Sequence, residues 1–461
     1  MSVATFLDVC VLVTVMAPAV LVALLGTPMF LQRPLGEDAV GRLTRVTMLV
    51  MLGTASVALA IYLVTGANPH VVSWGAWFTA SGSGFRFAFL VDGLSLGFAV
   101  FAAAVSGAVA AFSYRYLHRE PGYHRYFLLF AMFAIGITLI ALAGSIEVLF
   151  AGWELVGLSS ALLVGFFHER RAPVENALRV FAVYRVSDAA MLSAAVLLHH
   201  WAGSGSLSSL FLDDASVSSG LSTGETTVIA LLLIAAVAGK SALLPFSGWL
   251  PRAMEGPTPS SAVYYGALSI HAGCFLLMRA YPLLAQSPLA VWCTALVGGV
   301  TAVYATLTAR VQSDVKSALA YAALTQVGII VVEIACGLLA LAFVHMLAHA
   351  CFRLLQFMRA PNAIHELHDL VRASAASTEA THSMPPHTYD ASLPPPAALT
   401  AWRRRLYLFA LERGFADAWL DRVVVVPFQT LAGALDRFDH LLCGVRRATD
   451  AGPPPLASGR G

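Results

Sequence analysis

Long apolar runs recur along this chain from Phe6 to about Met358. A helix needs about 20 residues to cross the hydrocarbon core of a bilayer, and many of these runs reach that length. A soluble core would not need so many full-length runs. Lipid does, because every backbone amide must be paired within its own segment. Charged residues make up 12% of the chain, against roughly a quarter in soluble domains. The sequence therefore predicts an all-α integral membrane protein.

About eleven transmembrane helices are expected, one of them broken. The hydropathy pattern places the spans at about 5–27, 43–66, 90–113, 125–143, 145–167, 176–200, 226–244, 258–281, 289–310, 314–334 and 336–358. The stretch 67–89 is too short and too rich in Gly and Ser to span, so we expect a hairpin on one surface. Residues 202–224 are rich in Ser and Gly, which predicts a solvated loop.

Basic residues gather in alternate loops between the expected spans. The odd-numbered loops contain Arg33, Arg42, Arg115, Arg119, Arg125, Arg170, Arg171, Arg179, Arg252, Arg310 and Lys316, whereas the even-numbered loops hold little besides Arg86 and Arg279. By the positive-inside rule, the odd loops face the cytoplasm. We therefore expect a multi-pass protein of the bacterial inner membrane, with a periplasmic N-terminus and a cytoplasmic C-terminus.

The chain divides into five regions. Residues 1–84 hold the N-terminal helices and the hairpin, and residues 85–360 hold the main helix bundle. Residues 361–401 are rich in Ala, Ser, Thr, Pro and His, which predicts a flexible cytoplasmic linker. Residues 402–446 mix charged and apolar side chains, so we expect cytoplasmic amphipathic helices that lie along the membrane or dock on a partner. Residues 447–461 are rich in Pro and Gly, which predicts a disordered tail.

Several classes of function are disfavoured. Nucleic-acid binding is not expected, because the arginines collect in no single basic face. The six cysteines occur singly, without CxxC spacing, and are typical of small apolar packing residues. No ligand pattern for haem, flavin or an iron–sulfur cluster is present, so we expect no cofactor and no metal in this chain.

Two ionisable residues lie deep within the apolar spans. Glu154 has apolar residues on both sides, and a carboxylate buried in this way can exchange a proton near neutral pH. Lys240 and Lys316 are the only lysines of a chain that otherwise uses Arg, and Lys, unlike Arg, can lose its proton when buried. Opposed to each other, Glu154 and Lys240 would form an ion pair that switches as protons pass. A packing carboxylate bonded to Ser159 and a static salt bridge are the alternatives.

Further polar residues share helix faces with this pair. Arg185 and Asp188 are spaced for a pair within one helix, although Asp188 could instead reach toward Lys240 or Glu154. His345, His349 and Arg353 follow at steps of four, so all three line one face of the last span. The two histidines could relay protons, serve as satisfied buried residues, or bind zinc, for which no third ligand is visible. The later HELHD run (His365–Asp369) is better explained as a solvated turn.

Breaker residues crowd the segment after Lys240, namely Pro245, Gly248, Pro251, Gly256, Pro257 and Pro259. Such density breaks a helix and frees backbone carbonyls and amides inside the protein. Broken helices at membrane depth are tolerated where they line a cavity. A simple turn between two helices is the alternative.

Six motifs around these residues resemble the antiporter-like membrane subunits, a superfamily that includes subunit L of respiratory NADH:quinone oxidoreductase and the Mrp-type cation antiporters. The motifs are FLVDGLS (Phe89–Ser95), GWELVGLSS (Gly152–Ser160), RVSDA (Arg185–Ala189), GKSALLPFSGWLPRAMEGPTPSSA (Gly239–Ala262), VQSDVKSALAYAALTQVG (Val311–Gly328) and HMLAHACFR (His345–Arg353). The resemblance covers roughly residues 85–360 and implies a proton-translocating helix bundle.

The resemblance also implies roles for individual residues. It assigns Glu154 and Lys240 to the gating ion pair, with Asp188 tuning them. It places Arg185, His345, His349 and Arg353 on the accompanying polar axis. Where subunit L has a histidine after the GPTPxSAxx motif, this chain has Tyr264 and Tyr265, and His271 follows one and a half turns later as a candidate replacement.

Subunit L continues beyond this region with a further broken helix and a long lateral helix, whereas this chain continues into RLYLFALERGFADAWLDRVVVVPFQTL (Arg405–Leu431). Together with FRLLQFMRAPNAIHELHDL (Phe352–Leu370), this resembles DabB proteins, the membrane subunits of DAB inorganic-carbon pumps. The resemblance implies a DabA-like partner, a large zinc protein related to β-carbonic anhydrases, whose CO2 hydration is driven by cation flow through this chain. The zinc is then expected in the partner.

The sequence thus predicts a transporter subunit that is not itself an enzyme. It would conduct H+ or Na+ and drive bicarbonate accumulation by a carbonic-anhydrase-like partner. The alternative is a proton-pumping subunit of a respiratory NADH:quinone oxidoreductase or of an Mrp-type cation/proton antiporter. A third reading is a non-conducting scaffold that anchors a cytoplasmic enzyme.

Overall fold

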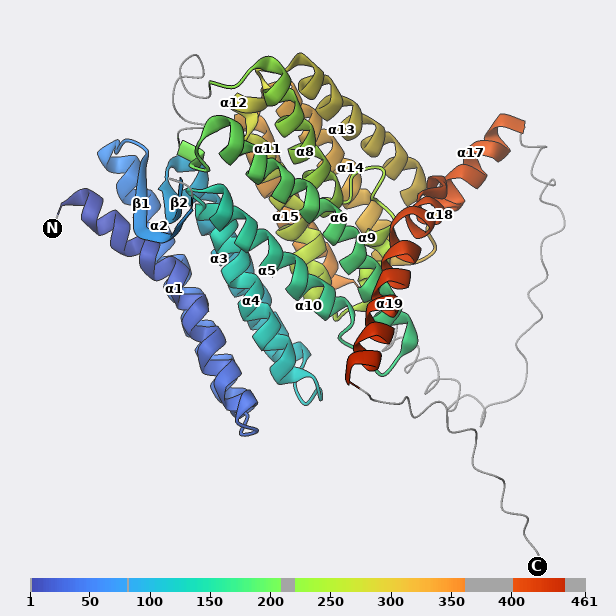
Figure 1. Ribbon diagram of the computed structural model, residues 1–461. Coiled ribbons are helices and arrows are strands. Elements are labelled where there is room, and N and C mark those ends of the chain that lie inside the picture. The colour runs from blue at the N-terminus through green and yellow to red at the C-terminus, as the bar shows by residue number, and fades with distance from the viewer. Residues whose placement is uncertain (1, 81–82, 209–219, 361–400, 444–461) are drawn as a thin grey trace, which may run out of the picture.

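The protein is a bundle of long helices that run side by side (Figure 1). The computed structural model describes residues 2–80, 83–208, 220–360 and 401–443. Within this part, 11 helical spans are long and apolar enough to cross a membrane, which confirms the predicted fold class. They are α1 (Val3–Phe30), α2 (Glu37–Thr65), α3 (Gly93–Tyr116), α4 (Tyr123–Leu142), α5 (Ile146–Val164), α6 (Arg171–Ala202), α8 (Thr223–Lys240), the composite span Thr258–Arg279, α13 (Pro288–Ala309), α14 (Val315–Ala335) and α15 (Leu339–Arg359).

Polar caps set where several of these helices begin. Asp92 precedes α3 and accepts a 2.7 Å hydrogen bond from the Ser95 amide. Asp314 precedes α14 and accepts an equally short bond from the Ser317 amide. Each carboxylate satisfies an amide that the first turn of a helix leaves unpaired.

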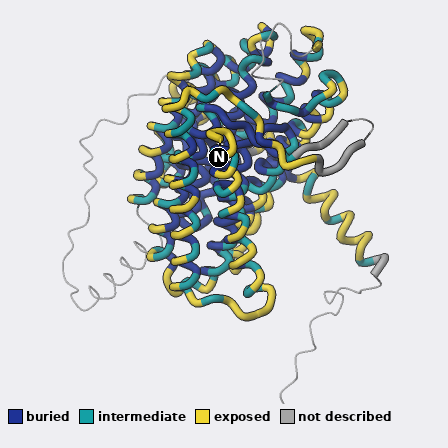
Figure 2. The backbone as a smooth tube through the Cα atoms, turned by 90° about the vertical axis from the view of Figure 1, so that its left-hand side faces the viewer, coloured by how far each residue is buried: buried dark blue, intermediate teal, exposed yellow. Residues whose placement is uncertain are grey.

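The composite span Thr258–Arg279 lies at the centre of the bundle. It consists of α10 (Thr258–Ser260), the π-helical turn η2 (Ser261–Ala267) and α11 (Ser269–Arg279). All of its most apolar window is buried, against 22% of that of α2 on the outside. Figure 2 shows the same arrangement, with buried backbone inside the bundle and exposed backbone on the outer helices.

The chain is broken on the way into this central span. α8 ends at Lys240, short of the predicted end at 244, because Pro245 disfavours a helical residue before it. Short turns α9 (Trp249–Arg252) and η1 (Ala253–Glu255) then lead into α10. The predicted broken helix is therefore present as this irregular crossing between α8 and α11.

Side chains satisfy the backbone groups that the break sets free. The Trp249 indole donates to the Gly239 carbonyl at 2.9 Å, and the Leu244 amide donates to the Thr301 hydroxyl at 3.0 Å. Ser241 Oγ donates to the Ile270 carbonyl of α11 at 2.7 Å. Irregular backbone can persist at this depth because these contacts replace the missing helical bonds.

A small antiparallel hairpin lies between α2 and α3, as predicted for residues 67–89. It is formed by β1 (His70–Ala80) and β2 (Ser83–Val91), with Val72 opposite Phe89. Its base is tied to the bundle, because the Gly144 amide donates to the Ala88 carbonyl at 2.8 Å. The hairpin extends two residues beyond its predicted end, so α3 begins at Gly93 and not at 90.

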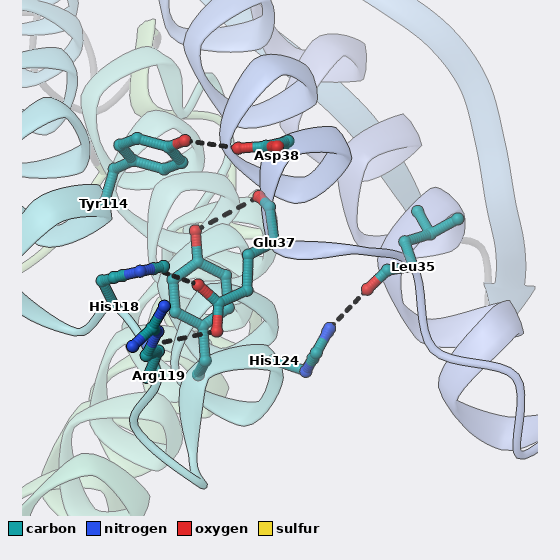
Figure 3. A network of polar contacts seen from close by, with 8 residues as sticks. Leu35, Glu37, Asp38, Tyr114, His118, Arg119 and His124 are labelled. Atoms are coloured by element: carbon teal, nitrogen blue, oxygen red, sulfur yellow. Dashed lines mark hydrogen bonds and ion pairs between the residues drawn. The ribbon is translucent and has the colours of Figure 1, made fainter.

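Polar contacts join the first loop to the α3–α4 turn at the arginine-rich end (Figure 3). Asp38 accepts a 2.6 Å hydrogen bond from the Tyr114 hydroxyl, and Glu37 lies 2.7 Å from His118 Nδ1. The Arg119 amide also donates to Glu37, at 3.2 Å. Both carboxylates stand in the first turn of α2, where the helix dipole favours negative charge.

The C-terminal segment (residues 401–443) is helical and folds back against the bundle. It comprises α17 (Ala401–Leu411), η4 (Arg413–Phe415), α18 (Ala416–Leu420), η5 (Asp421–Val425) and α19 (Val426–Cys443). Helices thus occur where residues 402–446 predict them, although Ala401, assigned to the linker, already belongs to α17. Residues 361–400 and 447–461, expected to be a linker and a tail, lie outside the described residues, as does the HELHD run.

Two elements far apart in sequence are clamped at the end opposite the arginine-rich loops. Arg279, the last residue of α11, donates to Asp92 at 2.5 and 3.0 Å and to the Ser95 hydroxyl at 2.6 Å. Both charged residues are buried. Burial raises the pKa of Asp92, but the Arg279 guanidinium and the Ser95 amide outweigh it and hold that pKa below its ordinary value. The clamp therefore ties the start of α3 to the central span.

Replacing Asp92 with Asn should destabilise the fold, because Arg279 would keep a buried charge without a counter-ion, at about 3–5 kcal/mol. We expect Asp92→Asn to lower the thermal unfolding temperature of the purified protein in detergent. The control is Asp38→Asn, which replaces an exposed carboxylate and should lower the unfolding temperature far less, because an amide oxygen can still accept the hydrogen bond from Tyr114. Equal unfolding temperatures for the two variants would contradict the clamp.

Candidate functional site: a buried polar axis

Lys240 lies fully buried at the end of α8. Its Nζ atom donates a 2.7 Å hydrogen bond to the Trp153 carbonyl of α5. The same atom lies 5.1 Å from the centre of the Trp153 ring and 4.6 Å from that of Tyr184. Two aromatic faces and one carbonyl thus surround the ammonium group, a setting that stabilises a cation through the ring quadrupoles.

Gly157 makes room for this lysine. A Cβ atom at Gly157 would lie 2.8 Å from Lys240 Nζ, closer than two such atoms can approach. Gly157 lies one turn after Trp153 on α5, where the side chain of Lys240 reaches α5. The glycine in the GWELVGLSS motif therefore has a spatial reason, which the sequence alone does not reveal.

Glu154 pairs with Arg185 and not with Lys240. Arg185 Nη2 lies 2.5 Å from Glu154 Oε2 and 2.7 Å from Asp188 Oδ2, so one guanidinium joins both carboxylates. The expected direct Glu154–Lys240 pair is thus replaced by an indirect arrangement, because Arg185 of α6 stands beside Glu154. The pairing of Arg185 with Asp188 within one helix is as the spacing predicts. Asp188 and Glu154 still attract the Lys240 ammonium electrostatically.

This charged cluster (Glu154, Arg185, Asp188 and Lys240) contains two acids and two bases. Its formal charge is therefore balanced, and a proton added to it or removed from it leaves an uncompensated charge in a medium of low dielectric constant. Glu154 and Arg185 retain 27% and 32% of their side-chain exposure on the bundle surface, whereas Asp188 and Lys240 are buried. Exposing the charged Glu154–Arg185 pair to lipid at this depth costs free energy.

A second cluster joins α11 to α15. His271 Nε2 lies 3.0 Å from His349 Nδ1, and Arg353 Nε donates to His349 Nε2 at 3.1 Å. Because a guanidinium can only donate, His349 Nε2 must accept, and its Nδ1 then carries the proton that is shared with His271. His271 Nδ1 in turn donates to the Ala267 carbonyl at 2.7 Å. The hydrogen bonds from Arg353 to Ala267 therefore run in one direction through two neutral imidazoles.

His345 has a different environment one turn away. Its Nδ1 lies 2.9 Å from Glu333 Oε1, and its Nε2 lies 3.2 Å from Gln326 Oε1, both on α14. Its ring centre is 6.4 Å from that of His349. His345 therefore contacts two side chains of α14, whereas His349 contacts Arg353 and His271, so the two histidines have different surroundings although they share one helix face. Sequence reasoning missed Glu333 and Gln326; a carboxylate within the predicted span 314–334 was the available signal.

A third pair at the other end of α5 and α6 was also missed. Glu147 Oε1 makes a very short contact with His199 Nε2, and both side chains are about four-fifths buried. Glu147 precedes Glu154 by seven residues, so the two carboxylates lie on one face of α5, about 10 Å apart along the axis. The Gly205 backbone packs directly against the pair, where a Cβ atom would collide with both side chains.

The structure gives no support to a zinc site at His345 and His349. Among the described residues, no group of three or more His, Cys, Asp or Glu side chains is arranged to hold a metal ion. His349 uses both ring nitrogens in hydrogen bonds to Arg353 and His271. The arrangement is instead one of separate protonatable side chains linked by hydrogen bonds.

Residues 143–385 match the family described as NADH:quinone oxidoreductase/Mrp antiporter, transmembrane, which is more than half of the chain. The chain belongs to this family. Residues 77–127 also match the N-terminal region of chain 5 of NADH-ubiquinone oxidoreductase (complex I). The predicted resemblance to antiporter-like subunits is therefore confirmed, and the protein is a multi-pass integral membrane protein.

Known relatives share this region. The chain is 33% identical to NADH-quinone oxidoreductase subunit L of Neisseria meningitidis serogroup A over 63% of its length and 45% of the relative. It is 31% identical to NADH-ubiquinone oxidoreductase chain 5 of Sus scrofa over 79% of its length and 59% of the relative. The chain thus spans about half the length of the curated relatives it matches.

Solved structures show the same fold. The Mrp complex of Dietzia sp. DQ12-45-1b matches with a TM-score of 0.62 and 27% identity, over 77% of this chain and 37% of that chain. The archaeal membrane-bound sulfane sulfur reductase matches with a TM-score of 0.66 and 21% identity, over 76% and 70% of the two chains. The second likeness shows the fold alone.

Gly157→Ala tests whether the position of Lys240 matters, because the added methyl group must displace the ammonium from the Trp153 carbonyl. We expect the variant to insert and fold but to lose ion flux in liposomes, on the order of tenfold or more. Gly53→Ala on α2 is the matched control, since a Cβ atom there meets nothing within 4 Å. Equal flux through the two variants would show that the ammonium position is unimportant.

Proposed function

We propose that this chain conducts protons as the membrane subunit of an energy-coupled inorganic-carbon pump. In this proposal its proton flow drives CO2 hydration by a DabA-like zinc partner related to β-carbonic anhydrases. The observation that carries the conducting role is the set of ionisable side chains on the membrane-length helices, of which Asp188, Lys240, His271 and His349 are buried. The proposed setting is the bacterial inner membrane, with the arginine-rich loops and the C-terminal segment in the cytoplasm.

Protons fit this axis better than sodium ions. A sodium ion must cross as a whole ion and needs several oxygen ligands, whereas a proton needs only a succession of groups that accept and release it. Among the described residues, no group of three or more His, Cys, Asp or Glu side chains is arranged to hold a metal ion.

Lys240 is the group that would switch. With Lys240 charged, the negative charges of Glu154 and Asp188 balance the positive charges of Arg185 and the ammonium. When Lys240 passes its proton on, the carboxylates lose an attracting charge and the next proton is drawn to them. The proposal thus keeps Glu154 and Lys240 as partners but routes their coupling through Arg185 and Asp188.

The histidine cluster would form the next part of the route. Arg353 holds His349 neutral, and Arg353 cannot give up its own proton. Proton transfer through His271 and His349 therefore requires the hydrogen bond between Arg353 and His349 to break. Gln356 offers it another acceptor, since Arg353 Nη1 already donates to Gln356 Oε1 at 2.6 Å. In this proposal, Arg353 controls proton transfer through the two histidines by making or breaking its hydrogen bond to His349.

The C-terminal segment supports coupling to a partner. Asp421 forms a 2.5 Å ion pair with Arg179, and Phe428 packs against Phe181, their ring centres 6.0 Å apart. Phe181 in turn lies 4.8 Å beneath the guanidinium of Arg185. A partner that moves this segment would therefore act on the residue that joins Glu154 to Asp188. Large apolar side chains of the segment, among them Trp402, Phe415, Trp419 and Phe438, remain exposed for such a partner.

A respiratory or Mrp-type subunit is the second candidate. The observation that favours it is the likeness to the Mrp complex and to subunit L, which covers most of this chain. A run of respiratory subunit genes beside this gene would support it, whereas a neighbouring gene for a large soluble Cys/His-rich protein would support the carbon pump.

Neutral replacements in the charged cluster should stop transport. In liposomes, Glu154→Gln and Lys240→Met should each reduce proton flux to the level of protein-free vesicles, because the charge balance that draws protons in is lost. Glu169→Gln is the control, since its carboxylate is 70% exposed. Wild-type flux in either cluster variant would refute the gating assignment.

Deleting residues 402–446 should release the partner while leaving the protein in the membrane. Co-purification in mild detergent, followed by zinc analysis and mass spectrometry, is the measurement. The full-length protein should carry a zinc protein of the carbonic-anhydrase kind, and the truncated protein should not. Co-purification of respiratory subunits without zinc would favour the second candidate, and an unchanged complex after truncation would refute the docking role.

A further inference from the structure

A cavity of about 460 Å³ lies at the arginine-rich end of the bundle, apart from the charged cluster and the histidines. Its wall combines the end of α3, the loop before α6, the α9–α10 turn, the start of α14 and η4 of the C-terminal segment. The space would hold a small ion together with several waters, each of which takes about 30 Å³. No step of the proposed proton route uses this cavity.

The wall carries more positive than negative charge. Its basic residues are Arg170, Arg252, Lys316 and Arg413, and its acidic residues are Glu255 and Asp314. The two acids are already engaged, because Asp314 caps α14 through the Ser317 amide and Glu255 lies 3.9 Å from Arg170. The excess of positive charge disfavours entry of a metal cation and favours an anion.

Lys316 is the side chain that most needs a ligand. It is the second of the two lysines of the chain and is partly buried. No described residue forms a hydrogen bond or a close ion pair with it, although the carboxylates of Asp314 and Glu255 attract its ammonium from farther away. A partly buried ammonium without a hydrogen-bond acceptor loses hydration that carboxylates at a distance replace only in part. It stands in the first turn of α14, a helix of 21 residues whose dipole adds to the positive potential.

We propose that this cavity binds a small oxyanion, with Lys316 as the central donor and Arg252 and Arg413 as further donors. An oxyanion would supply the acceptors that Lys316 lacks and offset the excess charge of the wall. Bicarbonate is the candidate that the proposed carbon pump would release at this end. Its identity rests on the proposed function, whereas the anion site itself does not.

Arg413 gives the site a further consequence. Its carbonyl accepts a 3.0 Å hydrogen bond from the Tyr304 hydroxyl, and its Nη2 lies 3.4 Å from Gln312 Oε1, so the C-terminal segment forms one side of the cavity. An anion bound there would bridge this segment to α14 and to the α9–α10 turn. Occupancy of the site should therefore hold the segment on the bundle.

The test uses the full-length protein in a neutral detergent without anionic lipid. Thermal unfolding is followed while bicarbonate replaces chloride at constant pH and ionic strength, and broadening of the ¹³C resonance of bicarbonate reports binding directly. We expect a saturable rise in unfolding temperature, with a midpoint at least about tenfold higher in Lys316→Gln. Arg404→Gln on α17 removes an exposed charge outside the cavity and should behave as the wild type.

The outcomes separate the possible ligands. Saturation by phosphate but not by bicarbonate would keep the oxyanion site and count against the carbon pump. Stabilisation by phosphatidylglycerol while no aqueous anion acts would overturn the soluble-anion site in favour of a lipid headgroup. Equal effects of bicarbonate and chloride, or identical behaviour of Lys316→Gln and the wild type, would overturn the proposal entirely.

Discussion

The buried ammonium group of Lys240 is the constraint on which the rest of the bundle depends. A charge within the hydrocarbon region is costly unless dipoles and counter-charges surround it. Here the Trp153 carbonyl, two aromatic faces and two nearby carboxylates provide that environment. Gly157 supplies the space. Because these groups come from α5, α6 and α8, the packing of three helices is tied to the charge state of one side chain.

The helix break after Lys240 persists beside this charge because neighbouring side chains satisfy its backbone. In a continuous helix the backbone amides and carbonyls form hydrogen bonds with each other, whereas at the break they need partners from neighbouring elements. Trp249 and Thr301 supply two of them. The central span then brings His271 against His349 of α15. The break therefore joins α8, which carries Lys240, to α11, which carries His271, through an irregular segment of chain.

Hydropathy and residue chemistry predict much of this architecture. The eleven spans follow from apolar runs, because lipid imposes helix length directly on sequence. His271, predicted as a candidate replacement for the histidine of subunit L, lies within hydrogen-bond distance of His349. The partner of Glu154 could not be predicted, because whether Arg185 or Lys240 stands beside it depends on the mutual rotation of α5 and α6. Glu147 and Glu333 could not be predicted as site residues for a similar reason, since each pairs with a histidine on another helix.

The central claim is that protons cross along these side chains without a metal cation moving with them. The direct measurement places the purified protein, with any partner that accompanies it, in liposomes that contain a pH-sensitive dye and no sodium. A potassium diffusion potential, negative inside, then drives uptake. The account predicts acidification of the interior at a rate that added sodium does not change. Absence of acidification until sodium is present, together with uptake of labelled sodium, would contradict it.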